Sequence, residues 1–208
     1  MNECLKNKTI RAISIVALIL FATGASVALL GSACSAREAD LKIKGLKVSI
    51  WPEYDDPRVL VIYRGEFENG PSFPAWVNFY IPPDAEINGA GIATPDGQLL
   101  WQEHKIVQED SRKVLSINIS SPTFFLEYYY NPFKGGALKS FEQKIENKYP
   151  IDVMLVEVQK PLKAEGFALT PESNDSYADP GGFTYFKYNF QNLKAQSSVK
   201  LIVAYKKE

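Results

Sequence analysis

The sequence predicts an all-β fold: an antiparallel β-sandwich of jelly-roll or immunoglobulin-like type that follows one N-terminal hydrophobic helix. One long uncharged segment stands near the amino end. Many short apolar runs with strand-like alternation come after it, separated by turn residues at intervals of about 8–12 residues. Beyond the uncharged segment, no long amphipathic helix and no fixed repeat is evident, which argues against parallel α/β, solenoid and propeller folds.

The uncharged segment, residues 12–33, follows three basic residues, Lys6, Lys8 and Arg11. A helix of about 20 apolar residues spans the hydrocarbon core of a bilayer, and basic flanks favour the cytoplasmic side. We therefore predict a cytoplasmic basic tip over residues 1–11 and a transmembrane anchor or signal segment over 12–33. The rest of the chain then faces outside the cytoplasm, with the membrane as its first partner.

Two alternatives to an uncleaved anchor remain open. Gly31 and Ala33 are small residues at the spacing that a signal peptidase reads, so cleavage would release a soluble protein. The segment ending in Ser32, Ala33 and Cys34 also fits a bacterial lipoprotein signal with Cys34 as the lipidated residue, although Gly31 departs from that pattern. All three interpretations place residues 37–208 outside the cytoplasm, at a cell membrane for the single-pass and lipid-anchored forms.

Residues 34–45 are predicted to be a tether and residues 46–208 the exported β-sandwich domain. The first strand covers Leu46–Ile50 and ends in a loop with two prolines, residues 51–57. Val59–Tyr63 is a continuous apolar run, which is typical of a strand covered on both faces. Pro95 and Gly97 predict a hairpin turn, since proline presets the first bend and glycine accepts positive φ.

The remaining predicted strands are read from apolar alternation. Residues 138–148 fit either a helix or a strand, and we favour a strand. Residues 172–182 are polar and predicted to be a loop. The other strands are predicted over residues 75–81, 98–102, 114–119, 124–130, 151–158, 183–190 and 199–205.

Composition limits the classes of function. The formal net charge is −1, so no basic face for nucleic acid is expected. The two cysteines are Cys4 and Cys34, which leaves the exported domain without a thiol. A cysteine nucleophile, a zinc ribbon and an iron–sulfur site are therefore excluded there, and we predict no cofactor and no metal site.

The candidate ligand-binding residues lie in one acidic loop with aromatic neighbours: Trp51, Glu53, Tyr54, Asp55 and Asp56. Carboxylate oxygens suit Ca²⁺, and aromatic faces stack on the apolar faces of sugars. The alternative, which we prefer, is a solvated turn, because acidic residues favour loops. No catalytic residue is predicted: His104 is the sole histidine, and no G-x-S-x-G motif accompanies it.

The aromatic residues allow two interpretations. Trp51, Trp76 and Trp101 could form a binding platform, but in a sandwich without disulfides they more often fill the space between the sheets. Tyr128, Tyr129 and Tyr130 are consecutive, so their side chains alternate between the two faces of a strand. At least one of them must point away from the core, and Tyr129 is the candidate.

The stretch WPEYDDPRVLVIYRGEF at residues 51–67 resembles a motif of bacterial membrane-attached extracytoplasmic β-domains that have no assigned activity. The runs FFLEYYYNP at 124–132 and VEVQKP at 156–161 fit the same resemblance. It implies an exported sandwich module and supplies no catalytic residue.

Three hypotheses for function follow. The first is a non-enzymatic, membrane-attached module that binds another envelope component, either a protein or a glycan. The second is a carbohydrate-binding module, which a flat strip of exposed aromatic side chains would favour. The third is a glycan-acting hydrolase whose carboxylates meet only in three dimensions, and a cleft with two carboxylates about 5–9 Å apart would favour it.

We predict that Cys34→Ser leaves the full-length chain in the membrane, because an uncleaved helix holds the protein without acylation. Mass spectrometry of the membrane-extracted wild-type and Cys34→Ser proteins checks this. A wild-type chain that begins at a diacylated Cys34 would instead establish lipid anchoring.

Overall fold

A computed structural model of the chain describes residues 41–68 and 72–208. The predictions for residues 1–40, which include the anchor over 12–33 and lipidation at Cys34, lie outside the described residues. No helix within the described ranges has the length and apolarity that crossing a membrane requires. Residues Leu41–Glu208 form one compact unit.

The described part of the chain is built from strands. In the first half they are β1 (Ile43–Pro52), β2 (Val59–Phe67), β3 (Ala75–Ile81), β4 (Glu86–Ala93), β5 (Leu99–Trp101), β6 (His104–Gln108) and β7 (Lys113–Ile119). In the second half they are β8 (Thr123–Tyr130), β9 (Leu138–Glu146), β10 (Ile151–Lys160), β11 (Glu165–Thr170), β12 (Asp175–Ala178), β13 (Thr184–Leu193) and β14 (Ser198–Lys206).

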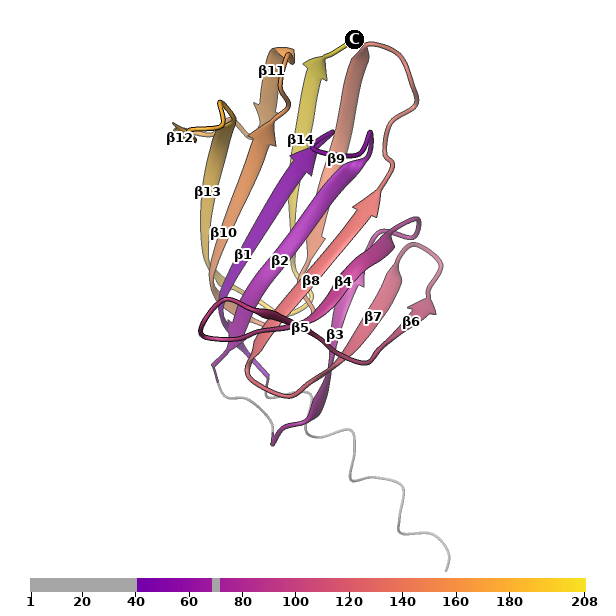
Figure 1. The fold of residues 1–208 in the computed structure, drawn as a ribbon, viewed down its shortest axis with the longest axis vertical. Helices are drawn as coiled ribbons and strands as arrows, with labels where there is room; N and C mark the ends of the chain where they lie inside the picture. The colour runs from indigo at the N-terminus through magenta and orange to yellow at the C-terminus, as the bar shows by residue number, and fades with distance from the viewer. Residues whose placement is uncertain (1–40, 69–71) are drawn as a thin grey trace, which may run out of the picture. The chain divides into compact units, whose positions relative to one another are not determined.

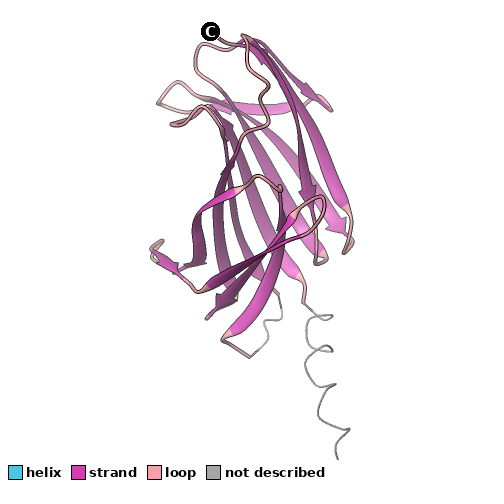
Figure 2. Cartoon of the chain, turned by 90° about the vertical axis from the view of Figure 1, so that its right-hand side faces the viewer, coloured by secondary structure: helices cyan, strands magenta, loops and turns pink. Residues whose placement is uncertain are grey.

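These strands form one large sheet and two small ones. The large sheet has eight strands in the order β12-β13-β10-β1-β2-β8-β4-β5. The small sheets have the orders β11-β14-β9 and β3-β7-β6. Figure 1 shows the large sheet facing the viewer, and Figure 2 shows the small sheets as a second layer. We call the side of the large sheet that faces the small sheets its inner face and the opposite side its outer face.

The prediction of a purely antiparallel sandwich is wrong at the centre of the large sheet. β1 and β10 pair in parallel, from Ile43 beside Ile151 to Ile50 beside Val158. The other strand pairs are antiparallel. A parallel pair needs a long crossover, and here the chain between the two strands supplies the strands from β2 to β9 instead of a helix.

The main core lies between the two layers. Side chains from the inner face of the large sheet and from both small sheets form one buried cluster. Its fully buried members include Ile50, Val61, Ile117, Tyr128, Met154 and Val203. Because one cluster joins all three sheets, the small sheets act as a single covering layer.

The prediction for Val59–Tyr63 is confirmed, because all five residues of this run in β2 are buried. Val59, Val61 and Tyr63 belong to the main core. Leu60 and Ile62 point the other way and form a second cluster with Phe125 on the outer face. A strand covered on both faces has no polar side, which is why this run shows no alternation.

Three element bounds refine the sequence predictions. Residues 138–148 contain strand β9, as favoured. β1 begins at Ile43, so the end of the predicted tether over 34–45 belongs to the sheet. The predicted loop over 172–182 contains the short strand β12, which periodicity missed because all four of its residues are exposed.

Val61→Asp is expected to prevent folding, because it places an unpaired charge in the core at a residue with 0% exposure. Val153→Asp is the matched control: Val153 is an exposed valine of the same sheet, and we expect a loss of at most about 1 kcal/mol there. Circular dichroism and denaturant melts of the full chain in detergent measure both. A Val61→Asp protein as stable as the control would contradict the burial of the inner face of β2 in the main core.

Candidate functional site

The acidic loop between β1 and β2 divides its carboxylates among different partners. Glu53 has a φ of +49°. Its side chain reaches the small sheet β11-β14-β9. Its carboxylate accepts hydrogen bonds from Nζ of Lys139 and from the hydroxyl of Tyr205, both at 2.7 Å, and lies 3.8 Å from Nζ of Lys207. Its side chain is only 11% exposed. Glu53 therefore ties the loop to β9 and β14 and is not free to bind a ligand.

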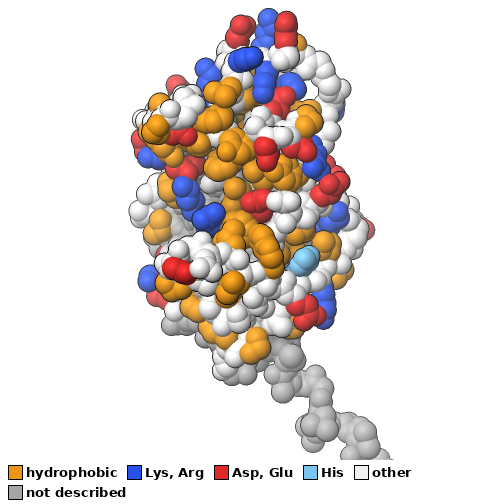
Figure 3. Space-filling view, in the orientation of Figure 1, with side chains coloured by type: hydrophobic (Ala, Val, Ile, Leu, Met, Phe, Trp, Pro, Cys, Tyr) orange, Lys and Arg blue, Asp and Glu red, His pale blue; other side chains and the backbone are white. Residues whose placement is uncertain are grey.

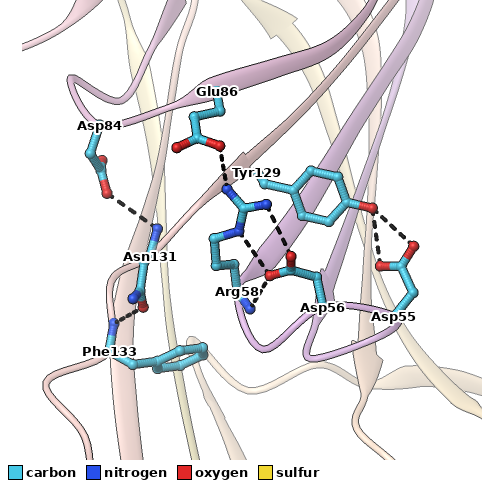
Figure 4. Close-up of polar contacts among 8 residues, drawn as sticks. All are labelled: Asp55, Asp56, Arg58, Asp84, Glu86, Tyr129, Asn131 and Phe133. Atoms are coloured by element: carbon cyan, nitrogen blue, oxygen red, sulfur yellow. Dashed lines mark hydrogen bonds and ion pairs between the residues drawn. The ribbon is translucent and has the colours of Figure 1, made fainter.

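Asp55 and Asp56 point to the outer face instead (Figure 4). Asp55 accepts a hydrogen bond from the hydroxyl of Tyr129 at 3.0 Å. Asp56 pairs with Arg58 at 2.8 Å, and Arg58 donates a second bond to Glu86 at 2.6 Å. Hydrogen bonds from Arg58 lower the pKa of the Asp56 carboxyl. The guanidinium also lies 4.9 Å from the centre of the Tyr129 ring, a cation–π contact.

These contacts do not assemble a cation site from Glu53, Asp55 and Asp56. No group of three or more His, Cys, Asp or Glu side chains in residues 41–68 and 72–208 is placed to hold a metal ion. The loop between β1 and β2 is ordered by ion pairs and hydrogen bonds rather than simply solvated.

The outer face carries a line of aromatic rings, which we call the outer aromatic row: Tyr177, Tyr185, Trp51 and Tyr129. Tyr177 stacks on Tyr185 with ring centres 5.0 Å apart, and Tyr185 contacts Trp51 at 6.4 Å. Leu60 pairs with both Trp51 and Tyr129 across the sheet. The row thus crosses the large sheet from β12 to β8. Figure 3 shows hydrophobic side chains gathered across this face.

Tyr54 of the acidic loop lies on this row. Its ring centre is 4.8 Å from that of Trp51 and 5.7 Å from that of Phe183, and its side chain is 45% exposed. Burial, followed by the hydrogen bond to Asp55, raises the pKa of Tyr129 to about 12. The structure therefore brings together Trp51, Tyr54, Asp55, Asp56 and Tyr129 among the predicted residues, and separates Glu53 from them.

Polar side chains lie beneath the row. Gln159 is fully buried and donates from Nε2 to the Tyr185 hydroxyl at 3.0 Å. Glu157 pairs with Lys47 at 2.5 Å and accepts a bond from Tyr177 at 3.1 Å. Oε1 of Gln159 and Nε1 of Trp51 are buried without a hydrogen-bond partner among the described residues. Buried polar atoms normally have a partner, so this pair can accept and donate one bond to an added polar group.

The prediction that the tryptophans fill the space between the sheets is wrong. Trp101 lies on the outer face against Phe125 and is 61% exposed. A Cβ at Gly89 would lie 2.4 Å from its ring, so glycine permits this position. Trp76 is 38% exposed on the small sheet, with Nζ of Lys105 lying 4.2 Å from its ring centre. Both tryptophans lie at outward positions near sheet edges, where no second layer from residues 41–68 or 72–208 covers them.

The alternation predicted for the three tyrosines is confirmed. Tyr128 and Tyr130 are buried on the inner face, and Tyr129 points outward. His104 is exposed, as is each residue of β6.

A groove of about 280 Å³ lies between the end of β3 and β9. Three carboxylates line it, and each has a partner: Asp84 accepts the backbone N–H of Asn131, Glu142 pairs with Lys200, and Glu146 pairs with Lys144. The carboxylates of this groove are therefore held in structural contacts.

No protein-family model matches the sequence, and no curated protein matches it. Solved structures show a distant likeness. Native yeast LTA4 hydrolase matches with a TM-score of 0.48 and 9% identity over 79% of this chain and 29% of that protein. Its complex with bestatin matches with a TM-score of 0.49 and 10% identity over 84% of this chain and 31% of that protein. A proposed protease from Parabacteroides distasonis matches with a TM-score of 0.46 and 12% identity over 80% of this chain and 40% of that protein. The chain spans less than half the length of each.

Glu53→Ala should destabilise the domain by about 2–3 kcal/mol, because it removes charged hydrogen bonds and leaves Lys139 without its partner. Glu142→Ala removes an exposed pair with Lys200 and should cost less than about 1 kcal/mol. Denaturant unfolding followed by tryptophan fluorescence measures both. Equal stabilities of the two variants would show that Glu53 does not join the layers.

Proposed function

We propose that residues 41–208 form a non-catalytic binding module, held at the outer side of a cell membrane, whose outer sheet face binds another envelope component. The observation that carries this proposal is the outer aromatic row, together with Tyr54 and Trp101. The inner face has two small sheets to cover it, whereas among the described residues no strand layer covers the outer face. A face this rich in exposed large apolar side chains favours a binding role.

The charges on this face support recognition rather than catalysis. Arg58 is held by Asp56, Glu86 and the Tyr129 ring. Glu157 is held by Lys47 and Tyr177. Arg58 keeps 27% of its side chain exposed, so it can contact a ligand. Groups held by fixed partners have little freedom to transfer protons. Attachment to the membrane rests on the uncharged segment 12–33 and its basic flank.

A carbohydrate ligand is the second candidate, and a specific observation favours it. Tyr54 and Tyr177 offer exposed aromatic surface beside the unpartnered Oε1 of Gln159 and Nε1 of Trp51. Sugar hydroxyls can donate to Oε1 of Gln159 and accept from Nε1 of Trp51. Tyr54 rests on Trp51, so the ligand would displace Tyr54 to reach them.

Radical footprinting of the full chain tests the proposal. Trp101 should be oxidised at least about threefold more slowly in native envelopes than in the purified protein, because its partner covers the outer face. Trp76, on the small sheet, is the internal control and should react equally in both. Equal rates for Trp101 would contradict the proposal. Loss of its protection after glycan digestion would identify the carbohydrate candidate, and loss only after proteolysis of the envelope would identify a protein partner.

A further inference from the structure

Strand β6 is an exposed sheet edge. It ends the order β3-β7-β6, and all five of its residues are exposed. Two of them are apolar: Ile106 is 45% exposed and Val107 is 58% exposed. An edge strand presents unpaired N–H and C=O groups to solvent, so it can accept another strand.

The hydrogen-bond ladder between β6 and β7 fixes which backbone groups of β6 point to the free edge. The N–H of Asn118 donates to the C=O of Glu103, and the N–H of Glu109 donates to the C=O of Arg112. Bonded and non-bonded pairs alternate in an antiparallel ladder. Lys105 and Val107 therefore bond to β7, whereas the N–H and C=O groups of His104, Ile106 and Gln108 point to the free edge.

The other described sheet edges are short, irregular or capped. β5 has three residues, β12 has four, and β11 carries a register shift. On β3 the N–H of Asn78 donates to the Tyr149 hydroxyl, and on β9 the C=O of Lys144 accepts from the Gln143 amide.

β6 lacks such protection. It pairs with β7 without a register shift and contains no proline. Its one lysine, Lys105, lies over the Trp76 ring rather than across the edge. A regular edge strand that has no register shift, no proline and no lysine across its edge can pair with another strand.

We propose that β6 pairs antiparallel with β6 of a second copy, about a two-fold axis at Val107. The two small sheets β3-β7-β6 then form one continuous sheet across the pair of molecules. Ile106 of each copy exchanges backbone hydrogen bonds with Gln108 of the other, and the two Val107 side chains meet at the centre.

Charge selects this register among those that overlap most of the strand. Centred on Val107, each Lys105 lies opposite Glu109 of the other copy. In a register centred on Lys105, the two lysines would face each other. In a register centred on Ile106, Glu103 of one copy would face Glu109 of the other. Opposite charges across a ladder stabilise it and like charges destabilise it, so the register at Val107 is favoured and should weaken with added salt.

Disulfide trapping tests the pairing in the full chain, with Cys4 and Cys34 replaced by Ser. Two Val107→Cys residues would form a non-bonded pair with Cα atoms about 4.5 Å apart, which a disulfide spans. Mild oxidation should give mainly covalent dimers on a non-reducing gel. Ile106→Cys should give at least about fivefold less dimer. Cross-linking at Ile106 but not at Val107 would overturn the register, and no cross-linking at either would overturn the pairing.

Two further changes separate pairing from chance collision. Ile106→Pro removes an outward N–H and leaves the bonds to β7, so the Val107→Cys dimer should fall at least about tenfold while the melting temperature stays close to that of the parent. Lys105→Glu should also lower the yield, and Lys105→Glu with Glu109→Lys should restore it. A dimer yield that neither Ile106→Pro nor Lys105→Glu lowers would contradict the proposal.

Discussion

The structure depends on the burial of both faces at the centre of the large sheet. β10, β1, β2 and β8 lie side by side there, joined by the parallel pairing of β1 with β10. Their inner faces form the core with the small sheets, and on β2 and β8 Leu60, Ile62 and Phe125 make a second cluster outside. Burial of apolar surface stabilises by about 25 cal/mol per Å², so both clusters stabilise a domain whose residues 41–208 contain no cysteine.

Burial of Leu60, Ile62 and Phe125 also explains why large side chains gather on the outer face. An outer cluster of aliphatic and aromatic residues is stable only when larger side chains shield it, and Trp51, Tyr129 and Leu99 pack against it. The β1–β2 loop completes this shield, since Tyr54 and Arg58 lie over the aromatic rings. Glu53 anchors the other side of that loop to Lys139 and Tyr205. One connection therefore orders both the candidate site and the junction between the layers.

Local sequence predicted the parts of the fold that depend on local pattern. Two local patterns were sufficient to predict burial correctly: the unbroken apolar run Val59–Tyr63 and the alternation of Tyr128–Tyr130. The parallel partner of β1 could not be found, because β10 follows about 100 residues later and pairing direction leaves no trace in periodicity. The acidic loop was found as a candidate, but the role of Glu53 depends on Lys139, Tyr205 and Lys207, which only the tertiary fold brings near it.

Native-state hydrogen exchange of the full chain tests the doubly covered centre most directly. The ladder-bonded amides of β1, β2, β8 and β10 should exchange only through global unfolding, with a common free energy, because these strands form the centre of the large sheet and pack on the main core. The amides of the short, exposed edge strand β12 should exchange far faster. If the amides of β1 and β10 exchanged as fast as these edge amides, the account of the large sheet would be wrong.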